Sequence, residues 1–234
     1  MKAIYKRELR AYFTSMLGYS FLTIFLLITG IQFYRINIGN NIATMARFFD
    51  SVLYLIMFFL PLLTIRLFAE DRKQKTDQLL FTAPISVWDI VLGKFFAAFT
   101  VFIIGTVITA IYPIIIMMYG KLPVGETLNG YLGFILFSSM ILAIGSFMSS
   151  VTENQVIAAI ATYGVIILIV FIDVLPIFIA NEAVSQIFVW LSPIRRFTDF
   201  SLGILNPEPI IYYLSLAGLF VFFTGLSLEK RRLS

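Results

Sequence analysis

Residues 70–94 read EDRKQKTDQLLFTAPISVWDIVLGK, and this charged segment separates two long apolar stretches of the chain. It carries most of the charge in the middle third of the sequence. A single large charged loop between apolar stretches is typical of a membrane protein that presents one face to a soluble partner. The segment therefore predicts a membrane subunit that is driven by another protein.

The composition is that of an integral membrane protein. Of the 234 residues, 60% are hydrophobic and 13% are charged, and the mean hydropathy is +0.95, whereas soluble domains contain about 25% charged residues. The chain has no Cys and no His, which excludes thiolate nucleophiles, disulfides and the usual zinc or haem ligands. The net charge of +4 does not indicate nucleic-acid binding, because in a membrane protein the positions of the charges decide their meaning.

Six segments are long and apolar enough to cross a membrane as helices, which takes about 20 residues each. They lie at residues 15–33, 48–68, 95–120, 127–152, 154–172 and 209–228. We therefore predict an all-α integral membrane protein with a six-helix domain at residues 15–228, a charged loop at 69–94, an outer segment at 174–208 and a basic tail at 229–234. Residues 183–194 are uncharged but too few to cross the bilayer, so they predict a re-entrant or interfacial segment before the last span.

The distribution of Lys and Arg predicts the orientation. Six crossings place both termini, the 69–94 loop and the 150–154 turn on one side. That side holds twelve of these residues, namely Lys2, Lys6, Arg7, Arg10, Arg66, Arg72, Lys73, Lys75, Lys94, Lys230, Arg231 and Arg232. The other side holds five, namely Arg35, Arg47, Lys121, Arg195 and Arg196. Because loops rich in Lys and Arg stay inside, we expect a multi-pass protein of the cell membrane with both termini in the cytoplasm.

Residues 1–14 are expected to form an amphipathic helix on the inner leaflet. Lys6, Arg7 and Arg10 share one helical arc, and the opposite arc is apolar except where Glu8 interrupts it. Such a helix either anchors the first span at the membrane surface or contacts a partner. The sequence leaves both meanings open.

Within the charged loop, residues 76–82 are predicted to form a short helix along the membrane surface, which Pro84 ends. Such a helix can dock in a groove of a soluble domain and transmit its movement, whereas a solvated connector explains the same residues equally well. Ser86 and Asp89 have the spacing of an N-terminal cap for a helix that leads into the third span.

The run LFAEDRKQKTDQLLFTAPISVWDIVLGK at residues 67–94 resembles the loop between spans two and three of ABC-2-type transporter permeases, in particular the gliding-motility-associated permease branch. The shared positions are Glu70, Asp71, Thr76, Leu79, Leu80, Pro84, Gly93 and Lys94. Residues 149–159 (SSVTENQVIAA), 191–204 (LSPIRRFTDFSLGI) and 210–232 also agree with that family. Lys75 and Gln78 depart from the branch, which usually has Gly and Glu at these positions.

The resemblance implies a permease with an ABC-2 or type V exporter fold, paired with a second permease as a homodimer or heterodimer. It also implies two cytoplasmic ABC ATPase subunits, and ATP and Mg²⁺ would bind to those partners rather than to this chain. Membrane lipids are the other expected partners, and nucleic acid is not. The sequence agrees in having no G-x-x-x-x-G-K-[ST] phosphate-binding motif, since its one Gly-Lys pair is followed by Phe95.

The resemblance further implies two sets of site residues. The expected ATPase-coupling set consists of Glu70, Asp71, Thr76, Leu79, Leu80, Pro84, Glu153 and Asn154. The expected outer gate, formed by short re-entrant helices, includes Trp190, Pro193, Arg195 and Arg196; a simple interfacial lid fits the same residues.

The fourth predicted span carries small residues at intervals of four, three and four, which places them on one helix face. They are Ser139, Ala143, Ser146 and Ser150. Small residues on one face favour close packing of helices, and they also suit a polar wall of a translocation route. Pro61 and Pro113 are expected to kink spans two and three.

The predicted function is therefore the membrane-spanning subunit of an ATP-driven transporter that exports an amphipathic, lipid-like, peptide or drug substrate. We predict no catalytic, cofactor or metal site in the chain itself. A scaffold that docks a cytoplasmic partner without transport has the same sequence features. An integral-membrane lipid enzyme is the third alternative, but it requires paired carboxylates, a His or a Ser with a base near one interface, and the sequence clusters none of these.

Overall fold

The computed structural model describes residues 1–76, 85–179 and 181–233, and these residues form helices and turns without a β-strand. The elements are α1 (Lys2–Thr14), α2 (Met16–Phe33), the π-helix η1 (Tyr34–Ile38), α3 (Ala46–Phe59), α4 (Pro61–Thr64), α5 (Ala69–Lys73), α7 (Val87–Thr109), α8 (Ile111–Tyr119), α9 (Val124–Val151), α10 (Gln155–Val174), the 3₁₀-helix η2 (Leu175–Ile177), α11 (Glu182–Leu191), α12 (Pro193–Ser201) and α13 (Pro207–Leu233). The predicted all-α fold class is confirmed.

Six helical segments of the described residues are long and apolar enough to cross a membrane. They run over Met16–Ile38, Ala46–Lys73, Val87–Tyr119, Val124–Val151, Gln155–Ile177 and Pro207–Arg232. Each overlaps one of the six spans expected from the sequence.

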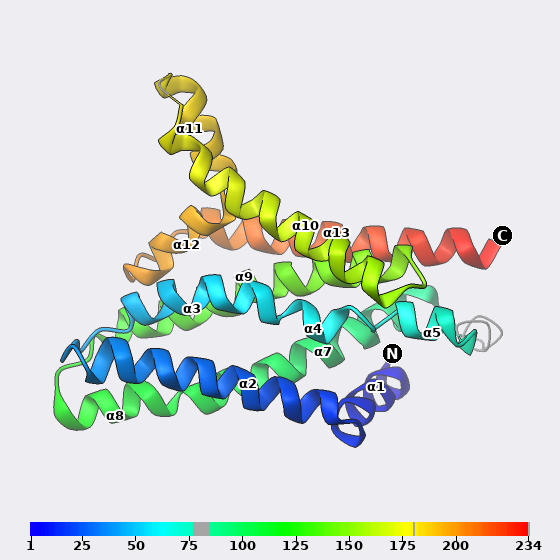
Figure 1. Ribbon diagram of the computed structural model, residues 1–234, viewed down its shortest axis with the longest axis horizontal. Helices are drawn as coiled ribbons and strands as arrows, with labels where there is room; N and C mark the ends of the chain where they lie inside the picture. Colours follow the sequence, from blue (N-terminus) through cyan, green and yellow to red (C-terminus); the bar gives the residue numbers. More distant parts are fainter. Residues whose placement is uncertain (77–84, 180, 234) are drawn as a thin grey trace.

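The fourth span, α9, is the centre of the bundle and the most buried of the six. It packs against α13, α12, α10, α3, α4 and α7 (Figure 1). Its side chains at Phe137, Met140 and Ile141 are fully buried. By contrast, α10 and α13 expose apolar side chains such as Ile160, which is expected of surfaces that face lipid or a second subunit.

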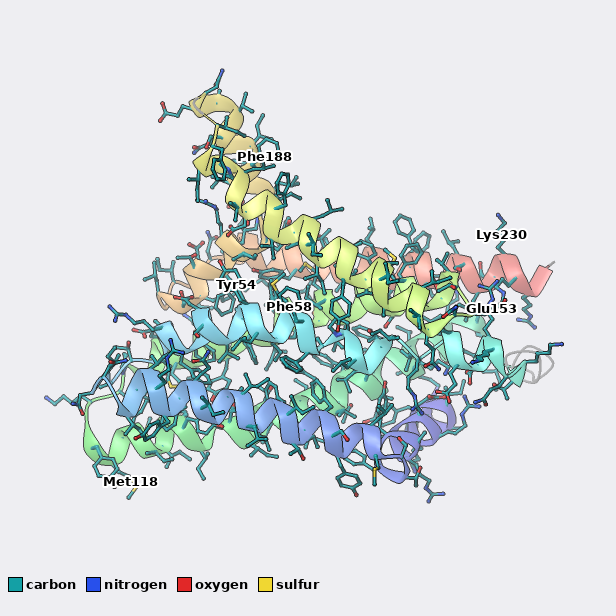
Figure 2. The ribbon with its side chains drawn as sticks, viewed as in Figure 1. Tyr54, Phe58, Met118, Glu153, Phe188 and Lys230 are labelled. Carbon is teal, nitrogen blue, oxygen red and sulfur yellow. The ribbon has the colours of Figure 1, made fainter. Side chains whose placement is uncertain are left out.

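The two ends of the bundle differ in what they carry. Both termini and α5 lie at one end, and the connection from α8 to α9 lies at the other (Figure 1). Glu153 and Lys230 accordingly lie at the opposite end of the bundle from Met118 (Figure 2). The C-terminal half of α10 diverges from the other helices and leads to α11, which projects from the bundle (Figure 1).

Spans two and three are interrupted near their prolines. The chain leaves the helix at Leu60, directly before Pro61, and at Ala110, three residues before Pro113. Proline has no N–H to donate to the carbonyl four residues earlier, which for Pro113 is that of Thr109. The hydroxyl of Tyr131 on α9 donates to that carbonyl at 2.9 Å, so the kink leaves this acceptor paired.

The helix that leads into the third span begins where the sequence predicts. The expected cap is Ser86, and α7 runs from Val87 through residues 87–94 into the apolar run that starts at Phe95. The hydroxyl of Ser86 caps this helix by accepting from the backbone N of Trp88 at 3.3 Å. Lys94 lies within this helix, and two carboxylates neutralise it, as described below.

The orientation of the bundle is open to a direct test, because the chain contains no native Cys. Lys75 and Lys121 are both exposed and follow α5 and α8, at opposite ends of the bundle. We expect Lys75→Cys to react with a membrane-impermeant maleimide only after the cells are opened, and Lys121→Cys to react in intact cells. Labelling of both from the same side would contradict the six-span topology.

Candidate coupling surface

Two segments expected to couple to a partner lie next to each other, at the end of the bundle that holds both termini (Figure 1). One is α5, and the other is the turn between α9 and α10. Nη1 of Arg72 on α5 donates to the backbone O of Val151 at 2.6 Å, which joins the two segments. They therefore form one continuous surface.

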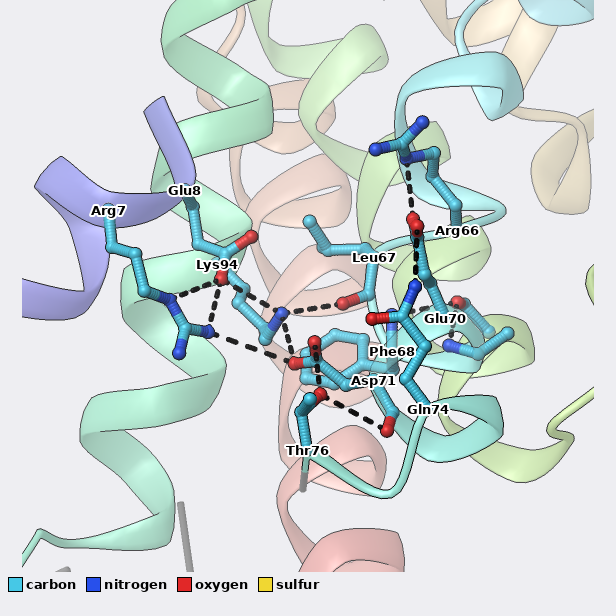
Figure 3. Close-up of polar contacts among 12 residues, drawn as sticks. Arg7, Glu8, Arg66, Leu67, Phe68, Glu70, Asp71, Gln74, Thr76 and Lys94 are labelled. Atoms are coloured by element: carbon cyan, nitrogen blue, oxygen red, sulfur yellow. Dashed lines mark hydrogen bonds and ion pairs between the residues drawn. The ribbon is translucent and has the colours of Figure 1, made fainter. Parts of the chain in front are cut away.

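Behind this surface lies a buried lysine. The side chain of Lys94 on α7 is only 2% exposed, and its Nζ lies 2.8 Å from Asp71 Oδ2 and 3.1 Å from Glu8 Oε1 (Figure 3). Nζ also donates to the backbone O of Leu67 at 2.7 Å and lies over the ring of Phe68. A buried ammonium group requires such partners, because its desolvation is otherwise very costly. One side chain of α7 thus connects α1 with the C-terminal end of span two.

Further ion pairs surround the lysine (Figure 3). Arg7 pairs with Glu8, and Nε of Arg66 lies 2.8 Å from Glu70 Oε2, one helical turn along the chain. The amide of Gln74 donates to the other oxygen of Glu70 at 3.2 Å. Three cations and three carboxylates thus surround a cavity of about 260 Å³. The cations are Arg7, Arg66 and Lys94, and the carboxylates are Glu8, Glu70 and Asp71. Glu70 and Asp71, which are predicted to couple to a partner, are therefore engaged within the chain, and Asp71 holds α5 against α7.

Gly93 allows α1 to approach α7 closely. A Cβ atom at this position would lie 3.1 Å from the side chain of Ile4 and 3.3 Å from the backbone N of Tyr5. Farther along the contact, the hydroxyl groups of Tyr5 and Thr100 are 3.0 Å apart. The adjacent residues Gly93 and Lys94 thus both hold α1 against α7. Gly93 leaves room for the close approach of α1, and Lys94 binds Glu8 of that helix.

Tyr12 fixes the other end of α1 to span two. Its side chain is 5% exposed, and its hydroxyl donates to the backbone O of Leu63. Burial raises the pKa of Tyr12 well above its ordinary value, and the negative charge of Glu8 adds to the rise. The hydroxyl therefore keeps its proton and remains a donor at every physiological pH. The apolar arc of α1 faces the bundle, and its basic arc is exposed.

The remaining residues of the predicted coupling set are less closely connected. The hydroxyl of Thr76 donates to Asp71 Oδ1 at 3.1 Å, whereas Leu79, Leu80 and Pro84 lie outside the described residues. Asn154 caps α10 by accepting from the backbone N of Val156 at 2.9 Å, and the adjacent Glu153 is exposed. Their contact with an ATPase stays a prediction.

The small residues of span four are buried within the single chain. Ser139, Ala143, Ser146 and Ser150 are at most 8% exposed. Each of the three hydroxyl groups donates to a carbonyl of its own helix, three or four residues earlier. This is the geometry of a packing face, and a role in a translocation route stays a prediction.

The predicted outer-gate residues lie where α11 and α12 meet the bundle. Arg195 is 3.3 Å from Asp173 at the end of α10, and Ser192 donates to the same carboxylate oxygen at 2.8 Å. Arg196 pairs with Glu208 on α13 at 2.7 Å and donates to the backbone O of Trp190 at 2.9 Å. These bonds fix α12 against α10 and α13.

The side chains of α12 and α11 differ in how far they are exposed. Pro193 is buried, and its backbone O accepts from Tyr213 at 2.6 Å, whereas the side chain of Trp190 is 65% exposed. α12 is therefore packed on the bundle, and α11 presents apolar side chains outward. A gating movement of these helices stays a prediction.

Sequence reasoning missed that Lys94 binds both Glu8 of α1 and Asp71 of α5. Two signals were present in the sequence. Glu8 interrupts the apolar arc of the first helix, and Lys94 directly precedes a long apolar run. Each signal indicates a charge that needs a partner inside the protein, but neither identifies that partner.

Among the described residues, no group of three or more Asp or Glu side chains is placed to hold a metal ion. Comparison with protein families gives one match: the model of a family described as "ABC-2 family transporter protein" matches residues 39–228. No curated protein matches the chain. The match covers four of the six spans in full and most of the last one, and it omits α1 and α2.

Proposed function

The chain belongs to the ABC-2 family of transporter proteins and is a membrane subunit of a transporter, and on that premise we propose that it is the permease of an ATP-driven exporter. Two cytoplasmic ABC ATPases would bind the surface formed by α5, the following loop and the turn between α9 and α10. ATP and Mg²⁺ would bind those subunits. The gliding-motility-associated branch, which the 67–94 run resembles, is the subfamily that we propose.

The observation that carries the proposal is the fixation of α5 by the buried Lys94. A surface that transmits a conformational change of the ATPase must be rigidly connected to the membrane helices that it moves. Lys94 supplies such a connection, because it binds Asp71 on α5, Glu8 on α1 and the backbone O of Leu67. A simple solvated connector would not need a lysine buried to 2% exposure.

A second permease, identical or different, would complete the translocation route. The outward apolar faces of α10 and α13 are available for this subunit or for lipid. We propose an amphipathic, lipid-like, peptide or drug substrate, moved outward, because the faces of α10 and α13 that a second permease would meet expose aliphatic and aromatic side chains.

The proposal is tested by co-expressing the chain with each ABC ATPase encoded near its gene and purifying the complex in lipid nanodiscs. We expect one ATPase to co-purify and to hydrolyse ATP. Leu79→Asp with Leu80→Asp should reduce its recovery roughly 30-fold or more, which corresponds to about 2 kcal/mol from a buried interface anchor. The matched control is Leu202→Asp with Leu205→Asp, the same change at exposed residues of the opposite end.

Equal recovery with both double variants would contradict docking at the 69–94 loop. An ATPase that binds but whose hydrolysis is the same with and without the permease would favour a scaffold. If no candidate ATPase binds in any lipid, the proposal of an ATP-driven transporter fails.

A further inference from the structure

The inner half of span two contains a second interruption that has no proline. Residues 65–68 separate α4 from α5, and Pro61 lies too far upstream to account for it. Sharp breaks in helices have identifiable causes, one of which is a side chain inserted into the backbone hydrogen-bond ladder.

Ser149 of α9 is inserted into the ladder at this break. In a continuous helix, the backbone N of Ala69 would donate directly to the backbone O of Ile65. Instead, Ser149 Oγ accepts from the N of Ala69 at 3.1 Å and donates to the O of Ile65 at 2.8 Å. It also accepts from the N of Phe68 at 3.1 Å. One hydroxyl group thus replaces a helical bond by a bridge and pairs three backbone groups.

Two other helices satisfy the neighbouring carbonyls of the same break. Tyr12 on α1 donates to the backbone O of Leu63, and Lys94 on α7 donates to that of Leu67. Ser149 has no exposed surface, so water cannot take over its bonds. The break is therefore built by side chains from three helices, and Ser149 is the one that separates the two groups of an otherwise normal helical bond.

We propose that Ser149 is a positioning residue for energy coupling: its hydroxyl keeps span two broken at residues 65–68 and so sets the direction in which α5 presents itself to the ATPase. This inference rests on the proposed function. Without the hydroxyl, the backbone N of Ala69 and the O of Ile65 lose their common partner, and the bond that a continuous helix makes between them becomes available. Span two then continues as a helix through the break, and α5 turns relative to α4.

The test compares two serines of α9. Ser146 is as buried as Ser149, but its hydroxyl donates to Leu142 of its own helix. Spin labels at Phe58→Cys and Lys73→Cys, both exposed, report the distance across the break in the chain alone in nanodiscs. We expect Ser149→Ala to shift this distance and Ser146→Ala to leave it at the wild-type value. A label pair at Leu132 and Val151 on the continuous helix α9 should not change in either variant.

The second part of the test measures ATP hydrolysis by the complex with the ATPase. We expect Ser149→Ala to lower permease-stimulated ATP hydrolysis about tenfold and Ser146→Ala to lower it less than twofold. An unchanged distance in Ser149→Ala overturns the proposal. A shifted distance with normal hydrolysis also overturns it, because Ser149 would then shape span two without affecting coupling. If no ATPase binds the wild-type chain, the proposed function fails, and the coupling role of Ser149 fails with it, whereas the distances still decide whether Ser149 makes the break.

If Ser149→Ala does not yield folded protein, Ser149→Thr and Ser149→Val replace it as a pair. Both variants add nearly the same volume, and only Thr keeps the hydroxyl. We expect Thr to retain the wild-type distance and Val to lose it. Identical behaviour of the two variants, including failure of both to fold, overturns the proposal.

Discussion

Replacing Lys94 by Met is expected to lower the free energy of unfolding by about 3 kcal/mol, because the two partly buried carboxylates that bind it would keep only the half-exposed Arg7 as a counter-charge. In this variant, the carboxylates of Asp71 and Glu8 would face each other at side chains only 22% and 13% exposed. The backbone O of Leu67 would lose a donor as well. The midpoint of thermal unfolding in detergent should fall by roughly 6–12 °C.

The control for this prediction is Lys73→Met, the same change at an exposed lysine of α5. Surface substitutions of this kind are usually worth less than about 0.5 kcal/mol. Adding Asp71→Asn to Lys94→Met should restore part of the lost stability, since it removes one of the uncompensated charges. A Lys94→Met variant that unfolds at the same temperature as Lys73→Met would show that the buried network does not hold α5.

The second large effect is expected at the outer end, where Phe200 of α12 packs on Gly133 of α9. A Cβ atom at residue 133 would lie 2.5 Å from the ring of Phe200 and 2.6 Å from its Cβ, and Phe200 is fully buried. Gly133→Leu therefore forces α12 off the bundle. We expect a loss of about 3 kcal/mol in the free energy of unfolding, at the upper end of overpacking effects.

The displacement of α12 can be measured separately from stability. Ile194→Cys on α12 is 7% exposed and should be nearly unreactive to a thiol reagent added from outside, but it should become reactive in the presence of Gly133→Leu. The matched control is Gly164→Leu on α10, where an added Cβ meets nothing within 4 Å. This control should be neutral or slightly stabilising, because Leu favours a helix by about 0.5–1 kcal/mol over Gly. Equal effects of both leucines would refute the close packing of α12 on α9.

The fold class followed from the sequence because the physical constraint behind it is strict. A bilayer requires about 20 apolar residues per helical crossing, and the charges of this chain interrupt its apolar runs at few places. The start of α7 at Val87 also followed from the sequence, because the cap at Ser86 is a local signal that depends on few neighbouring residues.

The contacts inside the candidate site could not be predicted from the sequence. Glu8, Asp71 and Lys94 come from three separate segments, and their distances depend on how α1, α5 and α7 pack. The break at residues 65–68 had no signal of its own, since its cause is Ser149, some eighty residues later in the chain. Such a break is predictable only once the neighbour of each helix is known.

The buried lysine also has a consequence for biosynthesis. Glu8 and Asp71 leave the ribosome before Lys94, so both counter-charges are already made when the third span enters the translocon. The lysine can therefore bind both carboxylates as soon as α7 packs against α1 and α5. Ser149 has the opposite timing: the second span enters the bilayer first and takes its final broken shape only when the fourth span arrives.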